Sequence, residues 1–410
     1  MIYFKYNTNH ISEPSFGYIF IYANRLLIHS LSLSERKLLV GLKRSKCLNM
    51  KVGAYFWYGF SKWDEMFTDR LLNVYSDRCP TWGWVSDTQE NFEYQIDLAA
   101  DNNISFFAID WYNSPYMGEY NRAVDMFLKA KNADRMEFCL MVANHAGAEV
   151  RLNEWKPLCE KWLPYLSDPH ALKVDGKPVI IFFLVHDLEE QLGGAESAKR
   201  CFDYLNELMV KNGFPGINII GCVCPYGSPG FYEIDYHPEW FNEHKWQEDI
   251  ARYKWEGYSA LTGYNYRKFN TYDENGKLAL SRPFSEMTMQ HEDCWDVFCR
   301  YNECGIKYIP PILSGYDARP WDCVWKCNPT GKRQNYCVDR KPETLYNHAV
   351  NAGLWLEKNK KYTMDDIAIV YAWNEYGEGA YIAPTVGDPD AKYLRSIKDA
   401  VDLINRKRKK

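Results

Sequence analysis

Two glutamates near the C-terminus have the spacing and the neighbours of a pair that could do acid–base chemistry. Glu375 and Glu378 lie three positions apart in the segment Trp373-Asn374-Glu375-Tyr376-Gly377-Glu378-Gly379. They directly follow the apolar run 367–372, which is short and β-branched, as a buried parallel strand is. Catalytic carboxylates gather at such strand ends in α/β barrels, and two carboxyl groups in different surroundings can break a glycosidic bond. The alternative is an exposed loop with two solvated glutamates.

The elements that would position this pair follow a regular alternation from Lys51 onward. Short apolar runs alternate with helical patterns, which is typical of repeated βα units. The runs predict strands at residues 52–57, 104–109, 137–143, 179–184, 217–221, 258–262, 306–310 and 367–372. We therefore expect a single-domain (β/α)8 TIM barrel over residues 50–410, with long βα loops at 225–250 and 316–340. A doubly wound open sheet is the competitor, but its glycine-rich turn after the first strand is missing.

Three helices have recognisable ends or faces. One is expected from about Ser86, where Ser86-x-x-Gln89 resembles a capping box. Another is expected from Ala195 to the stop signal Asn212-Gly213. A last helical pattern runs through Leu394, Ile397 and Val401.

The first 49 residues differ from the rest. Their apolar patch 18–23 is cut by Asn24-Arg25, and the basic stretch Lys43-Arg44-Ser45-Lys46 comes after the apolar residues. A signal peptide has these parts in the opposite order, and no stretch of the chain reaches the length of a membrane-spanning helix. We expect residues 1–49 to be an N-terminal extension outside the fold, and we expect the protein to be cytoplasmic.

The composition excludes some function classes. Apolar residues make up 46% and charged residues 25%, as in an ordinary globular protein, and a net charge of -5 gives no reason to expect a nucleic-acid partner. The 13 cysteines form no disulfide framework, and Cys222-x-Cys224 and Cys323-x-x-x-Cys327 lack the second half of a zinc site. We expect free cysteines in a reducing compartment, with no metal and no cofactor.

Aromatic, amide and acidic side chains follow the predicted strands, and in a barrel these positions share one mouth. Aromatic residues, 16% of the chain, can stack on sugar rings, while amides and carboxylates hold hydroxyl groups. Around the catalytic candidates Glu375 and Glu378, the binding candidates are Trp57, Tyr58, Asp110, Trp111, Tyr112, Asn144, His145, Tyr264, Asn265, Tyr316, Asp317, Arg319, Trp321, Trp373 and Asn374. Each could by itself be a core or structural residue, but together they indicate an oligosaccharide or polysaccharide substrate.

Over about residues 51–406 the chain resembles the WbsX-type family of carbohydrate-active proteins, named as glycosyltransferases of polysaccharide gene clusters. That family is similar in turn to the endo-α-mannosidase and endo-α-mannanase family of glycoside hydrolases. The resemblance rests on the segment 373–379 followed by Ile382-x-Pro384, on residues 52–58, and on Tyr316-Asp317 with Arg319-Pro320-Trp321.

The resemblance implies different roles for the two acids. The glutamate matching Glu378 acts as general acid and then base, while the one matching Glu375 helps the sugar's own 2-hydroxyl attack the anomeric carbon, with net retention. The proton donor then needs a raised pKa, and its partner must stay ionised, which Asn374 could assist. The residue before the second glutamate is often histidine in the mannosidases and is Gly377 here. Mannose specificity is therefore not implied.

Three functions remain open. A retaining glycoside hydrolase is favoured by the carboxylate pair and the barrel. A WbsX-type glycosyltransferase of surface polysaccharide biosynthesis is favoured by the family name; such enzymes often hold a metal with Asp-x-Asp. Asp388-Pro389-Asp390 has that spelling, but it precedes the last helix and we interpret it as its N-terminal cap. The third possibility is a sugar-binding protein without catalysis.

Overall fold

The computed structural model describes residues 49–61, 66–85, 87–227, 234–267, 271–272, 278–323, 331 and 333–406. The chain divides into a unit Met1–Cys47 and a unit Leu48–Lys410, and the fold below is that of the second unit. Our expectation for the first 49 residues lies outside the described residues, apart from Asn49.

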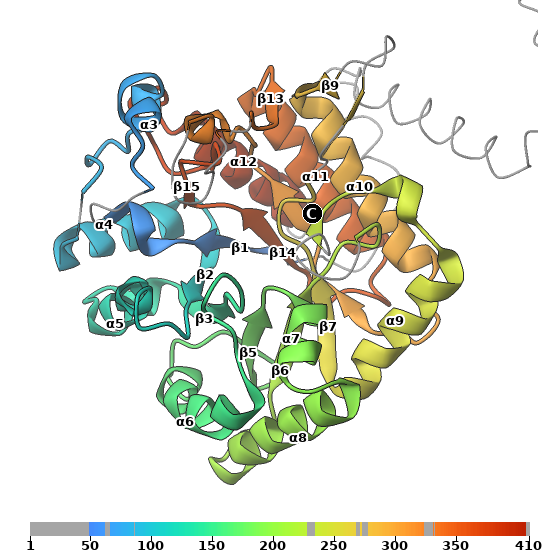
Figure 1. Ribbon diagram of the computed structural model, residues 1–410. Coiled ribbons are helices and arrows are strands. Elements are labelled where there is room, and N and C mark those ends of the chain that lie inside the picture. Colours follow the sequence, from blue (N-terminus) through green and yellow to red (C-terminus); the bar gives the residue numbers. More distant parts are fainter. Residues whose placement is uncertain are drawn as a thin grey trace, which may run out of the picture. The chain divides into compact units, whose positions relative to one another are not determined.

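Parallel strands form a ring at the centre of the second unit (Figure 1). In their order around the ring, seven of them are β7 (Tyr258–Thr262), β6 (Asn218–Cys222), β5 (Lys177–Phe182), β3 (Glu137–Val142), β2 (Ile104–Trp111), β1 (Lys51–Phe56) and β14 (Ile367–Tyr371). Each apolar run predicted as a strand between residues 52 and 262, and the run 367–372, forms one of them. Their side chains are buried on both faces, as the β-branched composition predicts.

The eighth position of the ring is filled by two short strands. β11 (Lys307–Tyr308) pairs with β7, and β12 (Pro311–Leu313) pairs with β14. Between them Ile309 donates to Leu261 O at 2.9 Å, and Pro310 O accepts from Ile369 N at 3.2 Å, so this stretch joins the two ends of the sheet. The expected (β/α)8 barrel is confirmed, but the strand expected at 306–310 is divided, since prolines at 310 and 311 have no N–H to donate.

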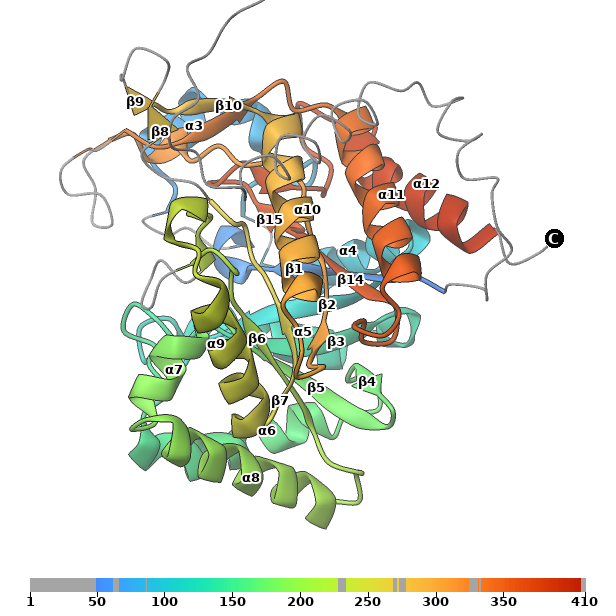
Figure 2. The same cartoon turned by 90° about the vertical axis from the view of Figure 1, so that its right-hand side faces the viewer.

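Helices surround the ring on its outside (Figures 1 and 2). They are α4 (Gln89–Asp101), α5 (Arg122–Lys129), α6 (Trp155–Leu166), α7 (Val185–Gln191), α8 (Ala195–Lys211), α9 (Glu243–Glu256), α10 (Phe284–Arg300), α11 (Pro342–Lys358) and α12 (Lys392–Arg406). Figure 2 shows α11 beside α12, and these two helices pack on each other. A shorter helix, α3 (Asp69–Asn73), lies in the loop between β1 and α4.

The helix ends test the expected caps. α8 begins at Ala195 and ends before Asn212, as expected, and Gly213 takes the left-handed conformation with φ +91°. Asp388 Oδ2 accepts from Tyr393 N at 3.2 Å, which confirms its role in capping α12. The helix expected from about Ser86 is α4, which begins at Gln89, because Thr88 and not Ser86 is its cap and accepts from Asn91 N. Ser86 itself lies outside the described residues.

The long loops have secondary structure of their own. In the loops after β7 and β12, β10 (Ser281–Pro283) pairs with β13 (Tyr336–Val338). After β14, β15 (Asn374–Glu375) and β16 (Ala380–Tyr381) form an antiparallel hairpin. Among the described helices, none is long and apolar enough to cross a membrane.

Candidate active site

The two candidate glutamates lie on the hairpin that follows β14, and its backbone is fixed to the strand beside it. Trp373 N donates to Tyr55 O at 2.8 Å. The amide of Asn374 bonds both backbone groups of Trp57, accepting from N at 2.9 Å and donating to O at 2.6 Å. Asn374 therefore joins the exits of the first and last strands of the barrel, and its side chain is not available to Glu375.

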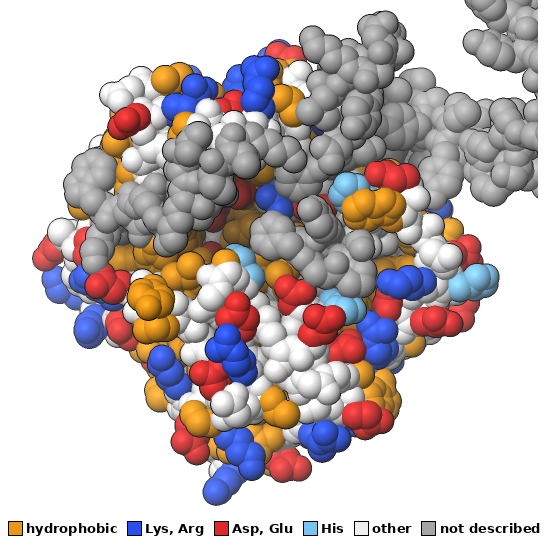
Figure 3. Space-filling view, in the orientation of Figure 1, with side chains coloured by type: hydrophobic (Ala, Val, Ile, Leu, Met, Phe, Trp, Pro, Cys, Tyr) orange, Lys and Arg blue, Asp and Glu red, His pale blue; other side chains and the backbone are white. Residues whose placement is uncertain are grey.

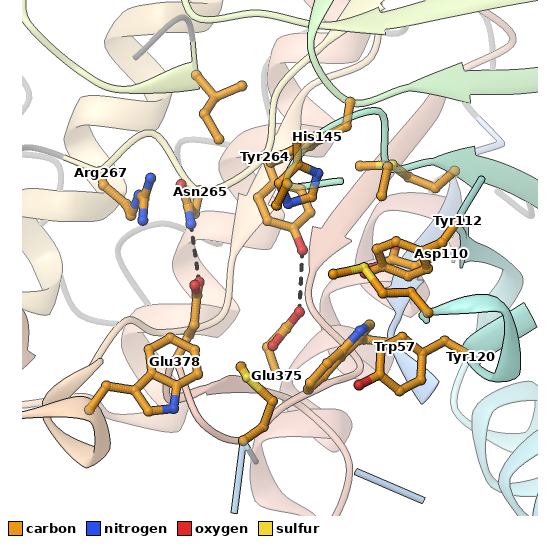
Figure 4. Close-up of a pocket in the computed structure, with 18 residues that line it drawn as sticks. Trp57, Asp110, Tyr112, Tyr120, His145, Tyr264, Asn265, Arg267, Glu375 and Glu378 are labelled. Carbon is orange, nitrogen blue, oxygen red and sulfur yellow. Dashed lines mark hydrogen bonds between the residues drawn. The ribbon is translucent and has the colours of Figure 1, made fainter. Parts of the chain in front are cut away.

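Glu375 and Glu378 line one cavity of about 240 Å³ at the carboxyl ends of the strands. Its other lining residues are Trp57, Met66, Asp110, Tyr112, Met117, Tyr120, Met141, Ala143, His145, Ala146, Phe183, Ile234, Tyr264, Asn265, Arg267 and Trp321. Figure 3 shows a hollow in this face where hydrophobic, acidic and basic side chains meet. In Figure 4 both carboxyl groups point the same way, toward Tyr264 and Asn265 on the opposite wall. We refer to this cavity as the acidic pocket.

Polar donors surround Glu378. Its Oε2 accepts from Asn265 Nδ2 at 3.2 Å and from the hydroxyl of Tyr371, the last residue of β14. Arg267 also lines the pocket and forms an ion pair with Asp235 at 3.2 Å. Burial opposes the charge of Arg267, but the neighbouring Tyr316, Asp235 and Glu378 raise its pKa above the ordinary value. A permanent positive charge therefore lies on the Glu378 side of the pocket.

Glu375 differs from Glu378 in its surroundings, because burial and acidic neighbours dominate there. Its side chain is buried, with Tyr264 Oη donating to Oε1 at 3.3 Å. Burial, and then the charges of Glu378 and Asp110, raise its pKa well above the ordinary value. Burial raises the pKa of Asp110 as well, and Asp110 Oδ1 has no hydrogen-bond partner among the described residues. In the free protein burial therefore favours the protonated form of both Glu375 and Asp110.

The remaining polar groups of the pocket are neutral at physiological pH. Burial lowers the pKa of His145 to about 4, so its imidazole is uncharged. Burial also raises the pKa of Tyr112 and of Tyr264, which keeps both phenols protonated. These hydroxyl groups can donate to an oxygen atom of a ligand, while Trp57 and Trp321 offer aromatic rings.

The structure brings together nine of the predicted residues around the acidic pocket: Trp57, Asp110, Tyr112, His145, Tyr264, Asn265, Trp321, Glu375 and Glu378. Their neighbours in sequence often do not reach it. Asp110 and Tyr112 line the pocket, but Trp111 between them packs on Trp162, with ring centroids 5.6 Å apart. The reason is that successive side chains of a strand point to opposite faces.

Four predicted binding residues, Tyr58, Asn144, Trp373 and Trp111, are occupied by other contacts. Tyr58 donates to Asp87, and the indole N–H of Trp373 donates to Gln95 at 2.9 Å. The amide of Asn144 bonds the backbone N and O of Leu184. These contacts hold neighbouring segments together, and the four residues do not line the pocket.

The three predicted residues Tyr316, Asp317 and Arg319, from the loop after β12, also lie outside the acidic pocket. Tyr316 is buried and forms a hydrogen bond with Arg267. Asp317 forms ion pairs with Arg78 and with Arg319, the latter at 2.7 Å. These three residues contact one another, Arg78 and Arg267, and do not line the pocket.

Some residues at the pocket were not predicted, and they differ in how clearly the sequence indicates them. Arg267, which lines the pocket, comes two positions after Asn265, and Tyr371, which donates to Glu378, ends the strand before the glutamates, so their places at strand ends could have indicated both. Met66 and Met117 come from irregular loops, and Tyr120 comes from a short 3-10 helix (Gly118–Asn121), where no periodicity indicates which side chain faces the pocket. One described group could bring three metal-ligand atoms together, His186, Asp187 and Glu190; none of these lines the pocket.

Fold and site together define an α/β-barrel protein with an acidic pocket at the carboxyl end of its strands. The family model described as glycosyltransferase WbsX matches residues 55–397, and the chain belongs to this family. The GH99 endo-alpha-mannosidase from Bacteroides thetaiotaomicron is similar in structure, with a TM-score of 0.54 and 14% identity over 88% of this chain and 99% of that chain. A glycoside hydrolase-like protein gives a TM-score of 0.58 and 14% identity over 87% and 95%. At this identity the likeness shows the fold, and no curated protein sequence matches the chain.

Proposed function

We propose that this protein is a retaining glycoside hydrolase that cleaves an oligosaccharide or polysaccharide with Glu375 and Glu378. The observation that carries the proposal is that both carboxyl groups face one pocket in different surroundings. Glu378 accepts hydrogen bonds from Asn265 and Tyr371, while Glu375 is buried next to Asp110. Environments that separate two carboxyl groups in this way suit one acid and one base.

The pair holds one proton in the reactive state, on Glu378. Glu375 takes the proton of the sugar's 2-hydroxyl, whose oxygen attacks the anomeric carbon while the leaving oxygen takes the proton of Glu378. Water then attacks the same carbon, giving a proton to Glu378, and the 2-oxygen recovers its proton from Glu375. Internal attack needs a 2-hydroxyl opposite the leaving group, so we expect 1,2-trans glycosides as substrates.

The free protein favours the other arrangement, with the proton on Glu375, and this has a consequence for binding. A 2-hydroxyl that donates to Glu375 stabilises its ionised form, and the proton of the pair is then available to Glu378. The raised pKa of Glu375 also makes its carboxylate a stronger base for a weakly acidic hydroxyl. Binding of the correct sugar would thus switch the pair into its reactive state.

Glutamine variants test these roles. Glu378→Gln removes the proton donor, so turnover of a glycoside with a poor leaving group should fall by roughly 10²-fold or more. A highly activated aryl glycoside needs no proton and should keep much of its rate. Glu375→Gln should be slow on both, because its work precedes departure of the leaving group. Glu207→Gln, at an exposed position on α8, is the control and should change neither. If both variants keep full activity, the proposed site is wrong.

Substrate specificity is expected to differ from that of the mannosidases. A Cβ atom on Gly377 would lie 2.6 Å from Trp321 Cζ2, so this tryptophan occupies the space that a side chain at 377 needs. Trp321 lines the acidic pocket. Gly377→His should therefore displace Trp321 and change the preferred glycoside, which a panel of aryl glycosides would detect; an unchanged preference would contradict this.

A glycosyltransferase is the alternative, favoured by the name of the family to which the chain belongs. It would require a nucleotide-diphosphate sugar and a grip on its phosphates, often through a metal. In Asp388-Pro389-Asp390, Asp388 already caps α12 through Oδ2. Binding of a nucleotide-diphosphate sugar, with transfer that a chelator abolishes and a divalent ion restores, would establish the transferase and replace the hydrolase.

We also propose that the protein works in a reducing compartment such as the cytoplasm. None of the eleven cysteines within the described residues forms a disulfide bond, and the sulfur atoms of Cys224 and Cys294 are 3.8 Å apart. Thiol titration of denatured protein taken directly from cells should find them reduced. Disulfide-bonded cysteines in that sample would contradict the proposal.

A further inference from the structure

A second cavity, of about 320 Å³, also borders the hairpin that carries the glutamates, through Gly379 and Tyr381. Three βα loops form its walls: Tyr75, Asp77 and Arg78 follow β1; Asp317, Arg319, Cys337 and Arg340 follow β12; Gly379, Tyr381, Thr385, Gly387, Asp388 and Tyr393 follow β14. None of these residues lines the acidic pocket. The two cavities adjoin where Glu378 faces one and Gly379 the other. We refer to the second cavity as the loop cavity.

Two buried polar groups of the loop cavity lack a partner among the described residues. They are the hydroxyl of Thr385, which is 1% exposed, and Oδ1 of Asp388, which is 6% exposed. The other oxygen of Asp388 accepts from Tyr393 N. A buried polar atom without a hydrogen bond is costly, so a ligand or a water molecule that reaches these two atoms from the cavity would stabilise the protein.

The charges of the loop cavity indicate a neutral ligand. In many α/β barrels the loops after the last two strands bind phosphate. Here three arginines are balanced by three aspartates, the lining residues Asp77, Asp317 and Asp388. Arg78 and Arg319 already pair with Asp317, and the unpartnered acceptor of Asp388 would repel an anion.

The arginines also leave donors for a hydroxyl-rich ligand. Arg340 donates through Nε to Ser314 O at 2.7 Å and through Nη2 to Tyr381 O, and no hydrogen bond among the described residues uses its Nη1. Its guanidinium lies 3.7 Å from the ring centre of Tyr393 and 4.5 Å from that of Tyr381, which fixes its orientation. Fixed donors beside the acceptors of Thr385 and Asp388 suit neighbouring hydroxyl groups, each of which both donates and accepts.

We propose that the loop cavity is a second binding site for a neutral sugar unit, separate from the acidic pocket. It has the size of a small-ligand site, about 300 Å³ or more. With the proposed function, it would hold a unit of the polysaccharide away from the bond that is cleaved. The role in holding the polysaccharide rests on the proposed function. The binding of a sugar unit in the loop cavity does not.

Crystals soaked separately with α-1,2-mannobiose, with cellobiose and with inorganic phosphate test the occupant directly. The expected result is a sugar ring in the loop cavity whose hydroxyl groups bond Thr385 Oγ1 and Asp388 Oδ1. Ordered water alone after both sugar soaks would overturn the proposal, because water would then satisfy the two groups. Phosphate at this position would overturn it too.

Thr385→Val tests the site in solution, since it keeps the shape and removes only the unpartnered hydroxyl. We expect binding of the polysaccharide substrate, measured by calorimetry, to weaken about two- to tenfold, with no loss of melting temperature. Hydrolysis of a small aryl glycoside should be unchanged. Thr363→Val, which removes a hydroxyl that donates to Lys360 O at 3.3 Å outside the cavity, is the control and should not affect binding.

Asp388→Asn is the second variant. Asn can still cap α12 with its amide oxygen, while the other oxygen of the carboxylate is replaced by an NH2 group. It should weaken binding at least as much as Thr385→Val. Full polysaccharide affinity in both variants would overturn the proposal. If the protein hydrolyses no glycoside, the same calorimetry with α-1,2-mannobiose in place of the polysaccharide still measures binding in the loop cavity, so failure of the proposed function and failure of this site can be told apart.

Discussion

At the scale of residues, Glu375 and Glu378 differ because of the side chains that reach each of them. Both lie on the same hairpin, three positions apart. Glu378 faces Asn265 and Tyr371 with Arg267 nearby, whereas Glu375 is buried beside Asp110. Spacing in sequence thus brings two carboxyl groups into one pocket, and residues from β2 and the loop after β7 give them different surroundings.

The buried state of Glu375 predicts a pH-dependent effect on stability. Its pKa is raised above the ordinary 4.5, so the folded state holds this proton more tightly than the unfolded state. The stabilising contribution is complete below that ordinary value and is lost as the pH rises through the raised pKa. Glu375→Gln stays neutral and avoids this loss. We therefore expect the variant to melt a few degrees above the wild type at about pH 8 and not at about pH 4.

Thermal unfolding at the two pH values measures this effect. Glu207→Gln on α8 is the control, because an exposed glutamate has the same surroundings in the folded and unfolded states. An equal difference between Glu375→Gln and the wild type at both pH values would show that burial does not perturb this carboxyl group.

The expectation that residues after each strand lie at the mouth of the barrel locates site residues only to within one position along the chain. It places Asp110, Trp111 and Tyr112 at the mouth, but the alternation of side chains turns Trp111 outward to Trp162. Which of two neighbours faces inward depends on the register and tilt of the strand in the closed barrel. This information is spread over the whole sheet, so the local sequence around residue 111 does not contain it.

At the scale of elements, one arginine holds the backbone of the hairpin that carries Glu375 and Glu378. Arg78, from the loop after β1, donates through Nη1 to Tyr376 O at 3.1 Å and to Asp317 O at 2.8 Å. Asp317 N in turn donates to Glu378 O at 2.5 Å. Gly379 has φ +67°, and a Cβ there would lie 2.9 Å from Asp317, so the contact requires glycine. Arg78 is therefore a positioning residue for Glu378.

Arg78→Met should reduce both stability and turnover. It breaks a buried ion pair, which costs about 3 kcal/mol, and it releases the backbone on which Glu378 sits. We expect kcat to fall about tenfold or more at a temperature where the variant is folded, with KM little changed. Arg78→Lys keeps the charge and should recover part of kcat. Arg406→Met, which breaks an exposed ion pair with Asp402, is the control and should cost less than about 1 kcal/mol.

Kinetics on a small aryl glycoside, together with circular dichroism to verify folding, separates the two effects. A purely structural role for Arg78 predicts a lower melting temperature with normal kcat below it. That result would contradict positioning of Glu378.

Helices and strands were predictable from the sequence where a local pattern determines them. They were less predictable where pairing with a segment far along the chain determines them. The run 367–372 is apolar and β-branched, and it forms β14. By contrast, β10 and β13 pair across more than fifty residues, and both are short enough that neither has a pattern of its own. The division of the eighth strand depends on Pro310 and Pro311, which remove two donors at the point where the barrel closes.

At the scale of the whole molecule, the alternation of strand and helix patterns was sufficient for the barrel. Right-handed βα connections leave few ways to arrange parallel strands that are each followed by a helix. The choice between a closed barrel and an open sheet depends on the pairing of β7 and β14 with the stretch 307–313. That pairing joins residues from opposite ends of the sheet, and the sequence indicated it only through the missing glycine-rich turn.

We propose that the folded unit begins at Met50. Met50 N donates to Asn405 Oδ1 at 2.9 Å, and Asn405 Nδ2 donates to Met50 O at 3.3 Å, which joins the start of β1 to the end of α12. Lys51 then pairs with Ile367 in the ring. A chain that starts at Met50 keeps these bonds, since its terminal amine can still donate. We expect its melting temperature to lie within about 2 °C of that of the full chain.

A chain that starts at Gly53 is the matched comparison, because it loses only three further residues. Those residues include the Met50 bonds to Asn405 and the buried Val52 of β1, so we expect a clear loss of stability, about 3 kcal/mol or more. Denaturant unfolding of the two shortened chains beside the full chain measures both effects. If the chain from Met50 is as unstable as the chain from Gly53, residues 1–49 contribute to the folded unit, and the boundary at Met50 is wrong.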